Sequence, residues 1–269
     1  FGHFYRCLKY SNFIKNKNKI IFLIKKNFTG KYQKKNLNGV KLRYIYFENL
    51  QSTLSKLDLV PRNTIIFLDT YNDKIRSINF KKFSNQHVNI LDFRAKCKSD
   101  YILDHTFQRN KKFHNNNSIV KVGANYFPIS KTLSFFKKEI ILINFGSVKS
   151  KKLIQSSLKF LDKIIIKNFY KIIILDKYFK KVDIPKLNMK NKIFIYKFSF
   201  NIEKIYAKTF FAFGACGISL YEKCYFQIPC ISKSVATNQM TNFKNFYSKG
   251  CILDFDKVTN LEMKKYQFN

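Results

Sequence analysis

The chain has 269 residues and a formal net charge of +35, from 51 Lys and Arg against 16 Asp and Glu. Its 46% apolar residues, among them 30 Phe, can bury a substantial core and exclude a disordered protein. A charge of this size ordinarily indicates a nucleic acid or an anionic surface as partner. Here Lys greatly outnumbers Arg, is scattered along the whole chain, and accompanies the Asn, Ile, Phe and Tyr that an A/T-rich coding sequence favours. We therefore expect a solvated lysine coat, with a nucleic-acid surface as the alternative.

The six cysteines form no CxxC pair and have no histidine at zinc-ligand spacing. Three of them lie in or beside apolar runs, which predicts small buried residues, and the pattern is typical of a reducing cytoplasm, with neither a metal site nor a cofactor expected. No apolar stretch approaches the roughly 18 residues that span a bilayer, and nothing at the start resembles a signal peptide. Because the chain begins with Phe1 and not Met, directly on a motif, we expect part of the natural N-terminus, with a first strand, to be missing. The oligomeric state stays open.

Short apolar runs alternate with longer amphipathic segments from end to end, which is typical of an α/β protein with mainly parallel strands. In the first half, helical spacing of apolar residues predicts a helix over Phe4–Lys15. Strands are predicted near Ile20–Ile24, Arg43–Phe47, Thr64–Asp69, Val88–Asp92 and Tyr101–Leu103.

A second series of elements follows a connection over residues 126–131, where Pro128 marks a boundary. It comprises a helix near Lys151–Asp162 and strands at Glu139–Asn144, Lys171–Leu175, Ile193–Tyr196, Thr209–Phe213 and Cys230–Ser232. The fold class predicted is α/β, with two Rossmann-like doubly wound domains (residues 1–130 and 131–269) that face a cleft. Ligands of such sheets bind beyond the carboxyl ends of the strands.

The most informative segment is a strand, a small-residue loop and a helix start between Thr209 and Glu222. We place the loop at Gly214–Ser219, where free backbone N–H groups and the helix dipole make a site for a phosphate. Gly214 and Gly217 permit close backbone approach, and Ser219 either caps the helix or donates to a phosphate oxygen. Glu222 is placed to accept sugar hydroxyls. The alternative is an ordinary strand–turn–helix with a serine cap and an exposed glutamate.

Two motifs carry a family resemblance. Residues 1–8, Phe-Gly-His-Phe-Tyr-Arg-Cys-Leu, resemble a signature of the UDP-sugar hydrolase of pseudaminic acid biosynthesis. The second motif combines the Gly214–Ser219 loop with Glu222-Lys223-Cys224, Ile228-Pro229 and Asn238-Gln239. Weaker similarities are Asp69-Thr70-Tyr71, Asp92 at the end of the next strand, the stretch from Asp100 to Asp104, Asn144-Phe145-Gly146-Ser147, and the Gly123 and Tyr126 pair. The Phe145–Val148 loop lacks a glycine and an acid of the family. That family has the two-Rossmann-domain (GT-B) architecture, which many glycosyltransferases share, so the fold alone does not fix the chemistry.

The resemblance implies a metal-independent hydrolysis that releases UDP from a UDP-linked diacetamido-trideoxy sugar. His3 would be the general base, because a neutral imidazole takes a proton from water at working pH. The substrate-binding residues implied are Gly2, Arg6, Asp69, Tyr71, Gly214, Gly217, Ile218, Ser219, Glu222, Asn238 and Gln239. His87, His105 and His114 receive no role.

Three other hypotheses stay open at this point. The first is a GT-B glycosyltransferase that passes the sugar from a UDP donor to an acceptor. The second is a basic nucleic-acid-binding protein, which the charge alone supports. The third is a weakened or inactive copy of the hydrolase.

Overall fold

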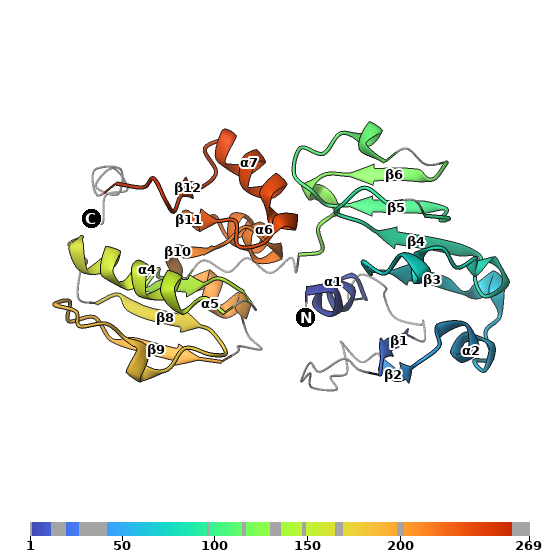
Figure 1. The fold of residues 1–269 in the computed structure, drawn as a ribbon, viewed down its shortest axis with the longest axis horizontal. Coiled ribbons are helices and arrows are strands. Elements are labelled where there is room, and N and C mark those ends of the chain that lie inside the picture. Colours follow the sequence, from blue (N-terminus) through green and yellow to red (C-terminus); the bar gives the residue numbers. More distant parts are fainter. Residues whose placement is uncertain are drawn as a thin grey trace. The chain divides into compact units, whose positions relative to one another are not determined.

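A computed structural model describes residues 2–11, 20–26, 42–95, 97–114, 117–129, 136–146, 149–164, 169–197 and 202–259, without the side chains of residues 2–5 and 42. The chain divides into two compact units, residues 1–130 and 131–269 (Figure 1).

The first unit contains two parallel sheets and short helices (Figure 1). One sheet pairs β1 with β2, and the other has the order β3-β4-β5-β6, with every pairing parallel. The helices and strands are α1 (Gly2–Ser11), β1 (Ile20–Lys25), β2 (Leu42–Phe47), α2 (Leu50–Ser55), β3 (Ile65–Leu68), α3 (Asp73–Arg76), β4 (Gln86–Ile90), β5 (Tyr101–Asp104) and β6 (Ile119–Val122).

The second unit is built on a six-stranded parallel sheet with the order β12-β11-β10-β7-β8-β9. Its helices and strands are β7 (Ile140–Asn144), α4 (Lys151–Lys163), β8 (Lys171–Leu175), β9 (Ile193–Tyr196), α5 (Ile202–Lys208), β10 (Thr209–Ala215), α6 (Ile218–Tyr225), β11 (Cys230–Lys233), α7 (Met240–Ser248) and β12 (Leu253–Asp254). Numbered along the chain, this is the 3-2-1-4-5-6 order of a doubly wound sheet. The order reverses between β7 and β10, so the crevice expected for a ligand lies at the carboxyl ends of these two strands.

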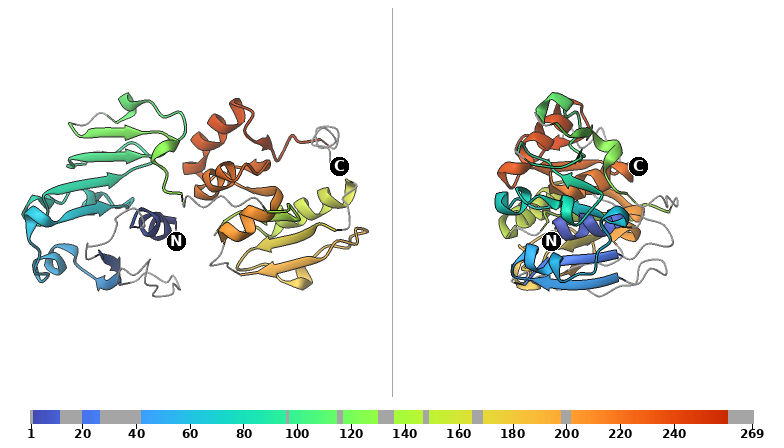
Figure 2. Two further views of the ribbon diagram at one scale, coloured as in Figure 1. Left: turned by 180° about the vertical axis from the view of Figure 1, so that it is seen from behind. Right: turned by 90° about the vertical axis from the view of Figure 1, so that its right-hand side faces the viewer.

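The core of the second unit explains why these segments form a parallel sheet. Strands β7 and β8 are nearly continuous runs of Ile and Leu, buried on both faces, as strands of a doubly covered parallel sheet are. Ile154, Leu158 and Leu161 recur at helical spacing on α4 and pack into the same buried cluster as β7, β8 and β10. Figure 2 shows the helices and strands of each unit from two further sides.

The α/β class with parallel sheets is confirmed, and several expected boundaries are corrected. Gly214 lies within β10, not in the loop, because it pairs with Asn144 of β7 and Ser232 of β11. Ser219 does not cap the helix: α6 begins at Ile218, and its N-cap is Gly217. β4 ends at Ile90, two residues before Asp92.

Some observed elements were not predicted, and some predicted segments lie outside the described residues. No prediction was made for β6, β12, α2, α3, α5 or α7. Residues 12–15 of the expected first helix, and Ser147 and Val148 of the Phe145–Val148 loop, lie outside the described residues. In the described ranges, no helix combines the length and the apolar character that crossing a bilayer requires.

The core assignment gives a stability prediction for Leu158→Ala. Leu158 is 0% exposed in the main cluster, so removing its side chain leaves a cavity and lowers the free energy of unfolding by about 2–5 kcal/mol. Val182→Ala is the matched control, because Val182 is 86% exposed and its change stays within about 0.5 kcal/mol. Urea unfolding followed by circular dichroism measures both values. Equal stability of the two variants would contradict the packing described.

Candidate functional site

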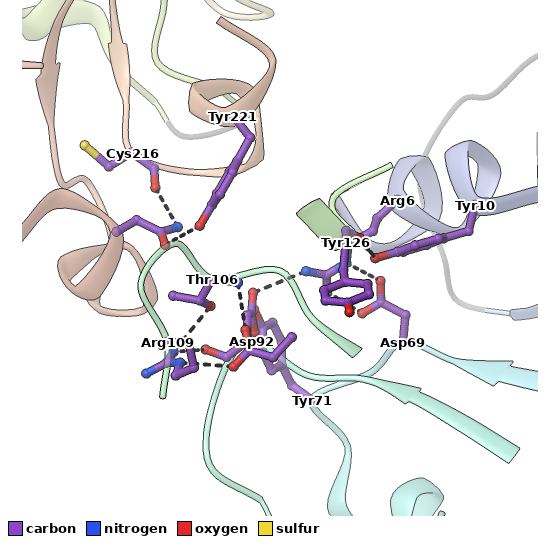
Figure 3. Close-up of polar contacts among 12 residues, drawn as sticks. Arg6, Tyr10, Asp69, Tyr71, Asp92, Thr106, Arg109, Tyr126, Cys216 and Tyr221 are labelled. Carbon is purple, nitrogen blue, oxygen red and sulfur yellow. Dashed lines mark hydrogen bonds and ion pairs between the residues drawn. The ribbon is translucent and has the colours of Figure 1, made fainter. Parts of the chain in front are cut away.

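In the first unit, charged side chains meet where strands β3 and β4 end (Figure 3). Arg6 of α1 forms two hydrogen bonds with the Asp69 carboxylate, of 2.6 Å from Nε and 2.5 Å from Nη2, and both side chains are almost fully buried. The same guanidinium reaches Asp92 at 3.3 Å, and the Tyr71 hydroxyl donates to Asp92 at 3.2 Å. Burial lowers the pKa of Arg6, but the adjacent carboxylates outweigh this and raise it, so Arg6 stays charged. The network therefore leaves Asp92, 20% exposed, as its accessible carboxylate.

A second network surrounds Asp104, the last residue of β5. Its carboxylate accepts hydrogen bonds from the Thr106 backbone N–H at 2.8 Å, His114 Nε2 at 2.8 Å and Arg109 Nε at 3.0 Å. Burial opposes ionisation of Asp104, but these partners hold its pKa below the ordinary value. Arg109 also donates to the Asp92 backbone carbonyl at 3.0 Å. The two networks are thus joined and fix the loops that follow β4 and β5.

His105, the residue after β5, is buried beside both networks. Its ring packs on Phe127 with centroids 5.2 Å apart. Burial and the positive charge of Arg6 lower its pKa to about 4, against partial compensation by nearby carboxylates. His105 is therefore neutral at physiological pH.

In the second unit, the helix α6 begins at the carboxyl end of β10. Its N-cap, Gly217, provides no side-chain hydrogen bond to the first turn. The side-chain amide of Gln239 lies beside it, since a Cβ added at Gly217 would be 3.3 Å from Gln239 Nε2. Gln239 is held there because its Oε1 accepts a hydrogen bond from the Val235 backbone N–H at 3.1 Å. The start of α6 therefore presents backbone N–H groups and an amide at one place, as an anion site does.

The rest of α6 is fixed by buried hydrogen bonds. Glu222 is 8% exposed, and its carboxylate accepts a hydrogen bond from the Tyr206 hydroxyl at 3.0 Å. The Tyr221 hydroxyl donates to Asn242 Oδ1 at 2.8 Å, while Asn242 Nδ2 donates to the Cys216 carbonyl at 3.2 Å (Figure 3). This chain of bonds links α6, α7 and the loop before Gly217. The loop that would hold an anion is thus supported from two sides.

The predicted site residues fall into two groups in the structure. Arg6, Asp69 and Tyr71 belong to one network of the first unit. Gly214, Gly217, Ile218, Ser219 and Glu222 belong to β10, α6 and the loop between them, and Asn238 and Gln239 to the short helix Thr237–Gln239. The backbone of Gly2 and His3 is helical, but the His3 side chain lies outside the described residues. Their roles in binding and catalysis stay predictions.

Sequence reasoning assigned no role to several residues that the structure brings to these two places: Asp92, Asp104, His105, Arg109, His114 and Lys223. A signal was available for Asp104 and His105, which directly follow an apolar strand. For Arg109, His114 and Lys223 no local pattern indicated burial. No group of three or more His, Cys, Asp or Glu side chains in the described part of the chain is arranged to hold a metal ion.

Comparison with known proteins gives little further information. No protein-family model and no curated protein sequence matches the chain. Among solved structures, the chain is similar to the glycotransferase of kitacinnamycin, with 10% sequence identity and a TM-score of 0.46. The similarity covers 62% of this chain and 45% of that one, so the chain matches less than half the length of that protein. A likeness this weak identifies no activity.

The buried ion pair predicts a large effect of Arg6→Met. The substitution leaves Asp69 buried without its charge partner, which costs about 3–5 kcal/mol of unfolding free energy. Adding Asp69→Leu removes the unpaired charge and should recover most of the loss. Lys26→Met is the control. Both side chains of the Lys26–Glu48 pair are exposed, so this substitution should leave the urea midpoint unchanged. A double variant as unstable as Arg6→Met would contradict this account.

The low pKa of His105 predicts that the protein becomes less stable as the pH is lowered. Below about pH 6.5 the unfolded chain gains a proton that the native His105 binds only near pH 4, so stability is lost as the pH drops through this window. The expected loss between pH 7 and pH 5 is about 2 kcal/mol. His105→Gln should remove this component, whatever its effect at pH 7, and urea unfolding at the two pH values measures it. His87, whose pKa is also lowered by burial, is present in both proteins and cancels in the comparison.

Proposed function

We propose that the chain hydrolyses a UDP-linked diacetamido-trideoxy sugar at C1, releasing UDP and the free sugar for pseudaminic acid biosynthesis. The observation that supports this best is the uncapped start of α6 at the switch point of a doubly wound sheet. Backbone N–H groups at such a helix start stabilise a diphosphate. Their effect grows as the glycosidic bond breaks, because negative charge accumulates on the departing UDP.

In this proposal the second unit binds the nucleotide. Gly217, Ile218 and Ser219 bind the diphosphate through the first turn of α6, and Gln239 contributes its side-chain amide. Glu222 accepts the ribose hydroxyls, and the hydrogen bond from Tyr206 supports this role because it fixes the carboxylate. Asn238, beside Gln239, contacts the phosphate or the sugar. Gly214 contributes from within β10, by leaving space rather than by direct contact.

The first unit then serves the reacting sugar and the water. We propose His3 as the general base; it stands three residues before Arg6, which ties α1 to the carboxyl ends of β3 and β4. Asp92 and Tyr71 are the accessible members of that network, so we assign them the contacts to the sugar or the attacking water. Asp69 is 1% exposed and acts through Arg6, which makes it a positioning residue.

A glycosyltransferase is the second candidate, because the same α6 site suits any UDP-sugar and the Asp92–Tyr71 pair can bind an acceptor hydroxyl as well as water. The two activities differ in one respect that is simple to measure. A transferase releases UDP only when an acceptor is added, whereas the hydrolase releases it in buffer alone.

His3→Ala tests the proposed mechanism. With EDTA present, the unaltered chain should release UDP from the diacetamido sugar nucleotide. His3→Ala should lower kcat at least about 100-fold, since a general base contributes roughly 10²–10⁴-fold. Lys26→Ala, an exposed residue of the same unit, is the control and should retain full activity.

The outcomes separate the hypotheses. A loss below about tenfold in His3→Ala removes the general-base role. UDP release that depends on an acceptor favours the transferase. No turnover with any UDP-sugar contradicts both.

A further inference from the structure

Lys223, the sixth residue of α6, is fully buried in the second unit. Its side chain is 0% exposed, and among the described residues Nζ has no hydrogen-bond partner. An ammonium removed from water without a partner is costly, and such groups are rare in folded proteins. Lys223 therefore needs an explanation that packing alone does not supply.

The position of Nζ is defined by a glycine. A Cβ added to Gly214 would overlap with Lys223 Nζ and lie 2.6 Å from the carbonyl oxygen of Asn144. Gly214 and Asn144 are paired residues at the ends of β10 and β7, the two strands between which the sheet order reverses. Nζ thus lies at the switch point, just before the loop that leads into α6.

The neighbouring thiols do not neutralise this charge. Burial raises the pKa of Cys216 to about 12 and that of Cys230 to about 11, although the charge of Lys223 acts in the opposite direction. Both thiols are therefore uncharged at physiological pH. Asp254 of β12 is a buried carboxylate of the same sheet, but no ion pair joins it to Lys223 in the described structure.

We infer that Lys223 is the buried counter-charge of an anion bound at the start of α6, and that the anion is a diphosphate. This rests on the proposed function and names a determinant of the same site. Two independent features of the β10–α6 connection support it: uncapped N–H groups at Gly217 and a buried, unpartnered ammonium against Gly214. In a low-dielectric interior such a charge acts over several ångströms without direct contact. Gly214 is required because any side chain there would displace Nζ.

Lys223→Met tests the inference. The change keeps an unbranched side chain and removes the charge. Lys171→Met is the matched control: it removes the same charge from an exposed residue at the amino end of β8, the opposite edge of the sheet. The probes are UDP, inorganic pyrophosphate and uridine, each titrated calorimetrically into the full chain at one fixed salt concentration.

The expected result is at least about a tenfold loss of affinity for UDP and for pyrophosphate in Lys223→Met, with uridine binding unchanged. Lys171→Met should differ from the unaltered chain by less than about twofold. The free Lys223→Met protein should melt at the same or a higher temperature, because an apolar side chain replaces an unpaired buried charge. Its melting temperature should rise less on addition of UDP.

Other outcomes overturn the inference or separate it from the proposed function. Unchanged UDP and pyrophosphate affinity in Lys223→Met overturns it, as does an equal loss for uridine, which would indicate a packing role. Pyrophosphate binding that depends on Lys223 without any UDP binding supports the anion site and contradicts the UDP-sugar hydrolase. If Lys223→Met does not fold, the ¹⁵Nζ resonance of Lys223 in the unaltered chain decides: it should shift on pyrophosphate addition, and an unshifted resonance overturns the inference.

Discussion

Every strand pairing described in this chain is parallel, and this single constraint places the polar chemistry of each unit. The carboxyl ends of parallel strands lie at one edge of the sheet, so the residues that follow the strands lie close together there. In the first unit the edge collects Asp69, Asp92 and Asp104, each at or just after the end of a strand. In the second it collects the loop before α6. Parallel neighbours need a crossover connection, and α6 is the crossover between β10 and β11.

Buried charged groups have different partners at the carboxyl edges of the two units. In the first unit, Arg6 and Arg109 are each hydrogen-bonded to carboxylates, so both buried cations have partners of opposite charge and fix the loops after β3, β4 and β5. Breaking one partner there leaves an uncompensated charge, which makes the network a rigid support. In the second unit, Lys223 has no such partner among the described residues. In our inference, the balancing charge at the second edge comes from an anionic ligand.

The strand pattern was predictable because buried parallel strands are continuous apolar runs, and β1, β2, β5, β7, β8 and β9 lie within a residue of their expected positions. The end of β10 was not predictable. Glycine is typical of a loop, and only the pairing of Gly214 with Asn144 shows that it belongs to the strand. Asp104 belongs to one of the weaker family similarities, but its role in a buried network was not predicted. Lys223 could not be singled out: lysine is ordinarily exposed, and its burial depends on the space that Gly214 leaves, a contact between residues nine positions apart on different elements.

The central claim is that the first turn of α6 binds a diphosphate. Backbone amide NMR of the full chain, titrated with UDP and in parallel with uridine, tests it most directly. The account predicts that the amide resonances of Gly217, Ile218 and Ser219 shift downfield and saturate with UDP, and move little with uridine, because N–H groups that donate to phosphate oxygens are deshielded. Unchanged resonances at these three residues in the presence of saturating UDP would contradict it.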